Sequence, residues 1–506
     1  MPLVRFAFVV STIMLIPSLS YARNLRDQDD EAPAALEAAR EALEAHKPLT
    51  ASAALTEMLE NRRFPERESE IHYTLGRALE DLQMPHSAQR HYLQALRGGP
   101  ESTWFKLSFA RLTAIADQTG DASDLVRVAA KLPPEALKGA AADNLALLQG
   151  IHALDEGDLK SARERLEQVS ESSPEYGRAQ YLRGVILVQQ SRPRSAVESF
   201  TASADTDGAD AEIARLRDLS LLGIARVYYE NGNFAAAERR YDAFPRDSER
   251  WADSIFERAW TNLQLHEPED TLGDLLTLRS PYYAENEFLP EIGVLGAIAH
   301  YEVCEYDEAQ ATIRNFEATY RPVHAELSAF LKDYAGEDGR ARAADAYARV
   351  FGPDPSPTEL PKSLFARSLR DRELLGLVQH LRELDAEEAA IAAQKRGWRD
   401  QVGDGLLTGI AEDRAKLERR AGLALLRELS DQTAALGDLL TQAQIIEFEL
   451  ADQRRVAGGE YHVAGTINAD YAVNTDTVYW PFNGEFWKDE LGYYEYGVRG
   501  CDTAIQ

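Results

Sequence analysis

The chain has 506 residues, more than one compact core usually holds, so it must form either several domains or one extended array. Apolar residues make up 44% of the chain, with alanine, leucine and glutamate abundant, which favours helices. The formal net charge of −29, from 84 acidic against 55 basic residues, argues against nucleic acid or an anionic membrane surface as a partner.

Residues 1–22 have the pattern of a signal peptide for export. One charge, Arg5, precedes the apolar run from Phe6 to Ile16, and the small residues ending at Ala22 suit a cleavage site. This run is too short for a transmembrane helix, which needs about 20 residues. We therefore expect cleavage after Ala22, a periplasmic protein without a transmembrane segment in the mature chain, and a disordered lead-in over residues 23–34.

The stretch 71–100 has the pattern of one helical hairpin. Its first half carries Gly76 on the apolar face, where a neighbouring helix must approach closely. Its second half repeats Ala88, Tyr92 and Ala95 at steps of four and three residues, which is one stripe of an α-helix. Small and aromatic residues in this arrangement indicate helix packing rather than catalysis.

The same pattern recurs downstream at a period of about 34 residues, with longer connections in places. It extends from residue 35, and we expect Pro322 to close the last clear unit. The small residues at its repeating packing positions are Gly76, Ala88, Ala122, Gly150, Ala162, Gly184, Ala196, Ala237 and Ala309. Units of this length cannot bury their apolar faces alone, so they must stack into a solenoid.

These positions resemble the tetratricopeptide repeat. The resemblance implies an all-α solenoid over residues 35–352, with a concave groove lined mostly by the first helix of each pair and suited to a protein segment. Tyr73 and Tyr228 are the candidate contacts with a partner in that groove. The implied mechanism is holding a partner rather than chemical turnover, so we expect no enzymatic activity.

After a linker at residues 353–363, the segment 364–457 carries two heptad-like runs. Their apolar positions alternate steps of three and four, from Leu374 to Ile391 and from Leu426 to Ala443. Such seams predict two long antiparallel helices or an interrupted coiled coil. The apolar seam can be covered by the chain itself or by a second copy, so a homo-oligomer through these helices is the alternative.

Residues 458–506 form a tail of different character, rich in aromatic side chains and expected to be non-helical. One interpretation is a lid that packs back on the helices. The other is a docking patch or a carbohydrate-facing platform, because aromatic faces suit both. The candidate binding residues are Tyr479, Trp480, Phe482 and Trp487.

No constellation for catalysis, cofactor binding or metal binding is recognisable. His86 and His91 are the closest histidine pair and lack an acidic partner at metal-site spacing. Cys304 and Cys501 are the only cysteines, too few for a disulfide scaffold. We expect Cys304 to be a small buried residue in a helix. Whether the two cysteines pair is left open.

Two stretches, 280–324 and 478–501, resemble periplasmic tetratricopeptide proteins of the deltaproteobacterial adventurous gliding motility machinery. This resemblance implies a scaffold in an envelope-spanning complex, with envelope proteins as partners. The alternatives are a cell-wall carbohydrate-binding accessory protein that uses the tail, or an outer-membrane assembly or division factor.

Overall fold

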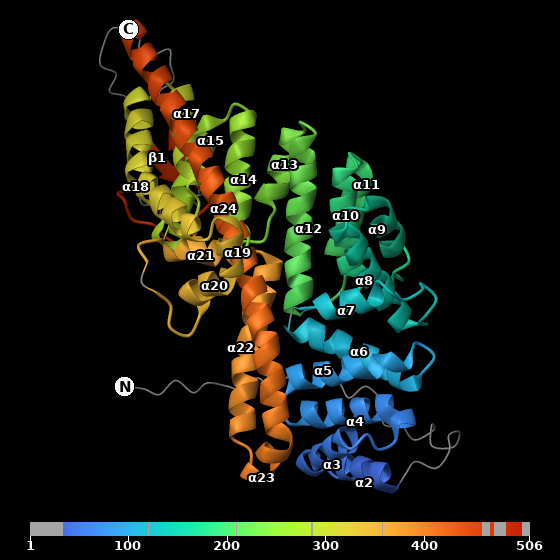
Figure 1. Cartoon of the computed structure of the whole chain (residues 1–506). Helices are drawn as coiled ribbons and strands as arrows, with labels where there is room; N and C mark the ends of the chain where they lie inside the picture. The colour runs from blue at the N-terminus through green and yellow to red at the C-terminus, as the bar shows by residue number, and fades with distance from the viewer. Residues whose placement is uncertain are drawn as a thin grey trace, which may run out of the picture.

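The computed structural model describes residues 34–119, 121–208, 210–284, 287–356, 358–457, 466–469 and 482–497. These residues are almost entirely helical, so the expected all-α class is confirmed. Figure 1 shows the helices stacked side by side, with a long C-terminal helical hairpin running alongside the first of them. The expected signal peptide, the cleavage site after Ala22 and nearly all of the expected lead-in lie outside the described residues.

Eight consecutive helix pairs form the solenoid of the described chain. They are α2 (Ala34–Glu44) with α3 (Pro48–Glu60), α4 (Glu68–Asp81) with α5 (Pro85–Ala95), α6 (Thr103–Thr119) with α7 (Ser123–Ala129), α8 (Ala140–Asp155) with α9 (Leu159–Leu166), α10 (Tyr176–Gln189) with α11 (Pro193–Ala204), α12 (Ala211–Glu230) with α13 (Phe234–Asp242), α14 (Trp251–Gln264) with α15 (Pro268–Leu278), and α17 (Glu291–Glu302) with α18 (Tyr306–Asp333).

Shorter elements connect and follow these pairs. They are the 3₁₀ turns Pro65–Arg67 and Leu96–Gly98, and the helices α16 (Pro281–Ala284), α19 (Gly336–Ala341), α20 (Ala343–Phe351) and α21 (Lys362–Ser368). The C-terminal hairpin consists of α22 (Arg372–Ala392), α23 (Arg396–Trp398), a π-helical segment Arg399–Gly403 and α24 (Asp404–Ala457). One antiparallel ribbon pairs β1 (Thr466–Ala469) with β2 (Tyr494–Gly497).

The turn inside seven of the eight pairs is built in the same way. One residue adopts a left-handed conformation, with φ between 54° and 77°, at His46, Gln83, Gly157, Ser191, Gly232, His266 and Cys304. The N–H of the following residue then donates to the carbonyl five positions earlier, at 2.8–2.9 Å. This hydrogen bond pairs a carbonyl group in the last turn of the first helix before the second helix begins. The eighth turn includes residue 120, which lies outside the described residues.

The glycines of the repeat mark close contacts between the two helices of a pair. A Cβ atom on Gly76 would lie 2.6 Å from Cε1 of Tyr92, far inside van der Waals contact. The same arrangement recurs at Gly150 with Leu166 and at Gly184 with Phe200. In each case the large residue lies 16 positions after the glycine, so its side chain fills the space that a missing Cβ leaves.

The alanines at the packing positions are placed less uniformly. Five of them are fully buried, namely Ala88, Ala162, Ala196, Ala237 and Ala309. Ala122 differs, because α7 has only seven residues and begins after it. Asp121 accepts a hydrogen bond from the N–H of Ser123 at 2.9 Å and so starts the helix there. The buried small residue of α7 is Ala129.

The expected end of the last unit at Pro322 is wrong. Helix α18 continues through Pro322 to Asp333. A proline inside a helix removes one hydrogen bond and costs about 3 kcal/mol. The second half of α18 packs against α24 and buries Leu327 completely. Burial against a helix from far along the chain therefore holds the segment in helical form.

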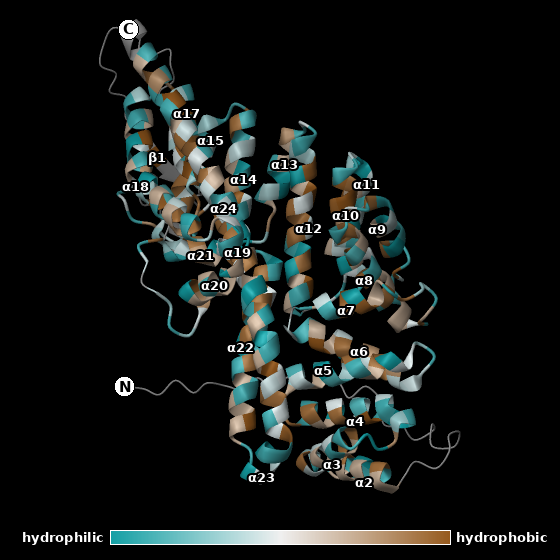
Figure 2. Ribbon diagram, in the orientation of Figure 1, coloured by the Kyte–Doolittle hydropathy of each residue, from teal (hydrophilic) through white to brown (hydrophobic). Residues whose placement is uncertain are grey.

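The C-terminal hairpin ties the two ends of the solenoid together. The first part of α24 packs on α22 and α5, and its later part packs on α20, α18 and α17. Buried residues of the first pairs, the last pair and both hairpin helices form one hydrophobic cluster. The buried residues of the helices from α8 to α12 belong mainly to smaller, separate clusters. Brown, apolar bands on the hairpin helices in Figure 2 mark the shared seam.

The hairpin docks on α5 through a buried carboxylate. Glu387 of α22 is 1% exposed and accepts hydrogen bonds from the N–H groups of His86 (2.8 Å) and Ser87 (3.0 Å), and from the Ser87 hydroxyl. It therefore caps the N-terminus of α5 from another helix, where the helix dipole favours negative charge. Nearby, Nε1 of Trp398 donates to Oγ of Ser52 at 2.9 Å and fixes the hairpin tip on α3.

Two histidines continue this buried contact. Nδ1 of His86 lies 3.0 Å from Nε2 of His380, and their other ring nitrogens lie 3.4 Å from Asp413 and Asp121. Burial opposes the charge of Asp121, yet hydrogen bonds from His380 and Ser123 hold the pKa of this carboxyl well below its ordinary value. Asp121 is therefore ionised at neutral pH and can accept a hydrogen bond from His380 of the hairpin.

We expect replacement of Gly76 by alanine to destabilise the protein. The added Cβ would collide with the buried ring of Tyr92, and such overpacking costs about 1–3 kcal/mol. Thermal unfolding followed by circular dichroism would measure the change. Gly405→Ala is the matched control, because its Cβ meets no atom within 4 Å and the helix should gain up to about 1 kcal/mol. An equal loss of thermal stability in both variants would contradict the assignment of Gly76 as a position of close helix packing.

We expect Glu387→Gln to loosen the hairpin from α5. The glutamine amide keeps one oxygen as an acceptor, but its NH2 group would face a backbone N–H. That N–H would lose its acceptor, which costs about 1–3 kcal/mol of stability. Hydrogen exchange should accelerate at the first amides of α5. Glu388→Gln, at a neighbouring and partly exposed residue paired with Arg414, should change stability by under about 1 kcal/mol. Unchanged exchange in α5 would show that Glu387 is not its cap.

Candidate partner-binding surfaces

The two candidate groove tyrosines lie on different parts of the solenoid and are not brought together. Tyr73, on α4, is partly buried, with its ring centroid 5.8 Å from that of Tyr92 and 5.4 Å from that of Trp104. Tyr228, on α12, is also partly buried and lines a surface pocket. Tyr73 therefore belongs to an aromatic packing cluster, whereas Tyr228 keeps a face toward open space.

The described part of the tail packs on the helices. Leu491 and Tyr494 are buried among residues of α14 and α15. The N–H of Gly492 donates to Oγ1 of Thr277 at 2.9 Å, and its carbonyl accepts from Arg258 at 3.1 Å. These contacts make the described part of the tail a lid over the seventh pair.

The four candidate aromatic residues of the tail have different placements. Phe482 packs in T-shaped contacts with Phe486 and Tyr494, with ring centroids 5.3 and 5.6 Å apart. Trp487 is 59% exposed. Tyr479 and Trp480 lie outside the described residues. Phe482 therefore contributes to packing, and Trp487 is the exposed aromatic residue among the two that are described.

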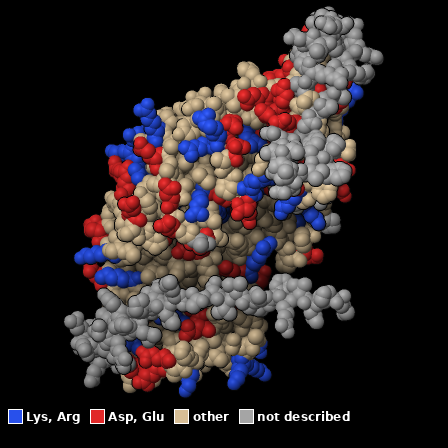
Figure 3. All heavy atoms as spheres, turned by 180° about the vertical axis from the view of Figure 1, so that it is seen from behind, with Lys and Arg blue, Asp and Glu red and all other residues tan. Residues whose placement is uncertain are grey.

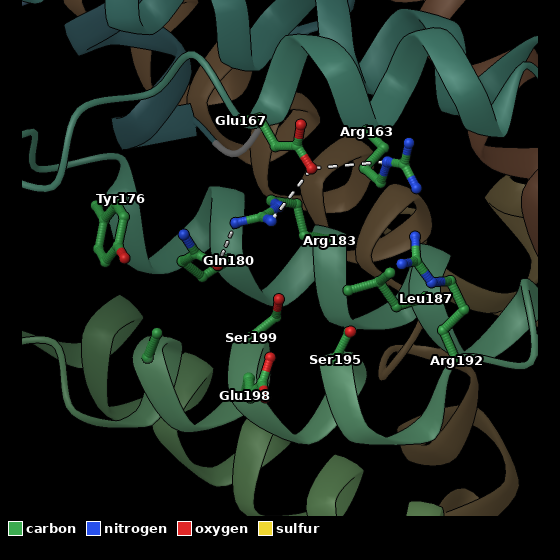
Figure 4. Close-up of a pocket in the computed structure, with 11 residues that line it drawn as sticks. Arg163, Glu167, Tyr176, Gln180, Arg183, Leu187, Arg192, Ser195, Glu198 and Ser199 are labelled. Atoms are coloured by element: carbon green, nitrogen blue, oxygen red, sulfur yellow. Dashed lines mark hydrogen bonds and ion pairs between the residues drawn. The ribbon is translucent and has the colours of Figure 1, made fainter.

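A pocket of about 430 Å³ opens between the outer helices α9 and α11, with α10 as its floor (Figure 4). Three arginines from three elements line it, namely Arg163 on α9, Arg183 on α10 and Arg192 in the turn before α11. Its acidic lining consists of Glu167 and Glu198. Three guanidinium groups therefore face two carboxylates.

The charges in this pocket are only partly balanced. Glu167 is shared, with its Oε1 3.6 Å from Arg163 Nε and 3.3 Å from Arg183 Nη2. Arg183 also donates to Oε1 of Gln180 at 3.0 Å. The Arg192 side chain makes no ion pair with a residue that the structure describes, and it points toward Arg163 from the opposite wall in Figure 4. The pocket therefore presents net positive charge.

A second, smaller pocket of about 280 Å³ lies on the next pair, α12 and α13. Its lining includes Tyr228, Arg239 and Arg240 and no acidic residue. The chain as a whole has a net charge of −29, and on the face seen in Figure 3 acidic and basic side chains are interspersed. Both pockets thus differ in sign from the protein's overall charge.

Sequence reasoning did not find these arginines. Each belongs to a different element, and only the stacking of α9, α10 and α11 brings them to one pocket. A usable signal was the recurrence of arginines at successive second helices, with Arg163 in α9, Arg192 directly before α11 and Arg239–Arg240 within α13.

Other kinds of site find no support in the described residues. No three His, Cys, Asp or Glu side chains there are arranged to hold a metal ion. None of the helices in the part of the chain that the structure describes is both long and apolar enough to cross a membrane. The lining of the first pocket contains no histidine, cysteine or lysine.

Comparison with known proteins yields structural likenesses alone. No protein-family profile and no curated protein matches the sequence. One similar structure is a tetratricopeptide repeat protein from Parabacteroides merdae, 19% identical, covering 50% of this chain and 93% of that one with a TM-score of 0.32. Another is the TPR domain of P58(IPK), 14% identical, covering 56% of this chain and 92% of that one with a TM-score of 0.20.

The fold of this chain follows from its own helix pairs. Repeated turns of one geometry, a glycine facing a large residue and a buried alanine in the second helix together define a tetratricopeptide-like α-solenoid. Solenoids of this kind present extended surfaces to other proteins.

Proposed function

We propose that this protein is an exported, periplasmic scaffold that holds partner proteins in a cell-envelope complex. The observation that carries the proposal is the uncovered surface of the middle pairs. The hairpin packs on the first and last pairs and the described ribbon on α15, whereas α9, α11 and α13 carry two open pockets. A solenoid whose end pairs are covered by the hairpin and whose middle pairs are uncovered is suited to binding partner proteins rather than to catalysis.

Two features support placing the scaffold outside the cytoplasm. Residues 1–22 have the pattern of a signal peptide. Cys304 is disulfide-bonded. It is half-buried in the left-handed turn between α17 and α18, and not a buried residue in a helix as expected. Disulfides persist mainly in oxidising compartments. Cys501, the other cysteine, lies outside the described residues.

A place in gliding motility machinery is the finer form of this proposal. It is supported by the resemblance of residues 280–324 and 478–501 to periplasmic tetratricopeptide proteins of that machinery. In this form the partners are other envelope proteins, and the pockets on the middle pairs are their docking sites.

The alternative of a cell-wall carbohydrate-binding protein has one observation in its favour. Trp487 and Tyr493 expose 59% and 45% of their surface on the tail. Aromatic faces of this kind can stack on sugars. Retention of the native protein on peptidoglycan, lost in Trp487→Ala, would favour this alternative.

We expect a photo-reactive residue in place of Ser195 to capture discrete partner proteins in native envelopes. Ser195 lines the first pocket, so a bound segment would lie within reach of the probe. Cross-linked products would be identified by mass spectrometry. The same probe at Arg396 is the control, because that side chain is 86% exposed on the hairpin tip. Identical products from both positions, or none from Ser195, would count against the scaffold.

We expect Cys304 to resist thiol labelling in protein taken from the envelope. A disulfide formed after export leaves no free thiol until a reductant is added. Maleimide labelling of denatured protein, with and without prior reduction, would measure this by intact mass. Full labelling without reductant would contradict a periplasmic location.

A further inference from the structure

We propose that the pocket between α9, α10 and α11 binds an acidic peptide segment of a partner protein, whose carboxylates pair with Arg163, Arg183 and Arg192. The proposal rests on the scaffold function above and names the chemistry of the partner. It concerns the surface of the second helices, α9 and α11, and not the groove lined by the first helices.

The described residues supply only some of the acceptors that these guanidinium groups can use, namely Oε1 of Gln190 for Arg163 at 3.4 Å and Oε1 of Gln180 for Arg183 at 3.0 Å. Nε of Arg163 and Nε of Arg183 are buried without a hydrogen-bond partner. Oε1 of Glu167 lies 3.6 Å from Nε of Arg163 and 3.3 Å from Nη2 of Arg183. One carboxylate cannot form a bidentate pair with both guanidinium groups. Arg192 faces the same space with no ionic partner from the described residues (Figure 4). Additional carboxylates would pair these donors and relieve repulsion among the three positive charges.

The rest of the lining favours a peptide over a small anion. Ser195 and Ser199 point from α11 into the same space, and Tyr176 stands at its far end in Figure 4. Their hydroxyl groups can donate to peptide carbonyls. Glu198 also lines the pocket and would repel a compact multiply charged anion such as phosphate. Carboxylates spaced along a chain can reach each arginine while avoiding Glu198.

Continuity along the solenoid also favours an extended ligand. Helix α11 packs on α12, which forms a pair with α13. The pocket there has Arg239, Arg240 and Tyr228 in its lining. A segment lying across the second helices would therefore meet arginines at successive pairs. A surrounding net charge of −29 would repel an acidic segment from most other surfaces and so favour this one.

The test measures binding of a fluorescent glutamate-rich decapeptide to the full mature protein by anisotropy. We expect binding to weaken at least tenfold in the double variant Arg163→Gln/Arg192→Gln, because two charged contacts are lost. Arg165→Gln is the matched control, since this partly exposed arginine lies on the same helix but not in the pocket. It should bind within about twofold of the unchanged protein.

A second variant separates binding from folding defects. Glu198→Gln removes a competing carboxylate from the lining and should tighten binding severalfold, a gain that a misfolded protein cannot produce. A glutamine-rich peptide of equal length should bind at least tenfold more weakly than the glutamate-rich one.

Several outcomes would overturn the proposal. They are no binding of the glutamate-rich peptide to the unchanged protein, equal binding of the glutamine-rich peptide, or equal loss in Arg165→Gln. Displacement by inorganic phosphate as readily as by unlabelled peptide would assign the site to a free anion. If peptide binding fails while the Ser195 probe captures partners, the acidic chemistry is wrong and the scaffold stands. If the peptide binds but the Ser195 probe captures no partner, the acidic-peptide chemistry of the pocket stands and the scaffold function is wrong.

Discussion

The solenoid depends on one hydrogen bond that closes the turn inside each helix pair. A single residue enters the left-handed region so that the next N–H reaches back to the last turn of the first helix. Five of the seven residues in this position are not glycine, and each such conformation costs roughly 1–2 kcal/mol. The closed turn brings Gly76 against Tyr92 and Gly184 against Phe200, so packing inside the pair offsets that strain.

The hairpin adds a constraint that repeat stacking does not provide. In an open solenoid each unit contacts only its neighbours, and the terminal units have one bare side. Here Glu387 caps α5 near one end, and α24 covers α18 near the other. The apolar seam expected to drive either self-packing or oligomerisation is buried within the chain, with Leu377, Leu381 and Leu429 almost fully covered. The surface that neither the hairpin nor the described ribbon covers is thereby concentrated on the middle pairs.

The sequence predicted the repeat, the helical hairpin and the change of character in the tail, because each depends on local spacing of apolar or aromatic residues. It could not predict that α18 passes through Pro322, since that depends on α24 about a hundred residues later. The capping role of Glu387 was equally hidden, because its partners lie about 300 positions away. The same limit applies to the first pocket, where Arg163, Arg183 and Arg192 meet only after stacking.

The separation along the chain between the hairpin and the helices on which it docks affects the order in which the protein can fold. Domains usually fold as they emerge from synthesis, N-terminal part first. The first helix pairs of this protein, however, lack the cap on α5 and the contact on α3 until α22 and α23 have been made. In a nascent chain, packing of the first pairs would therefore stay incomplete until about 300 further residues have been made.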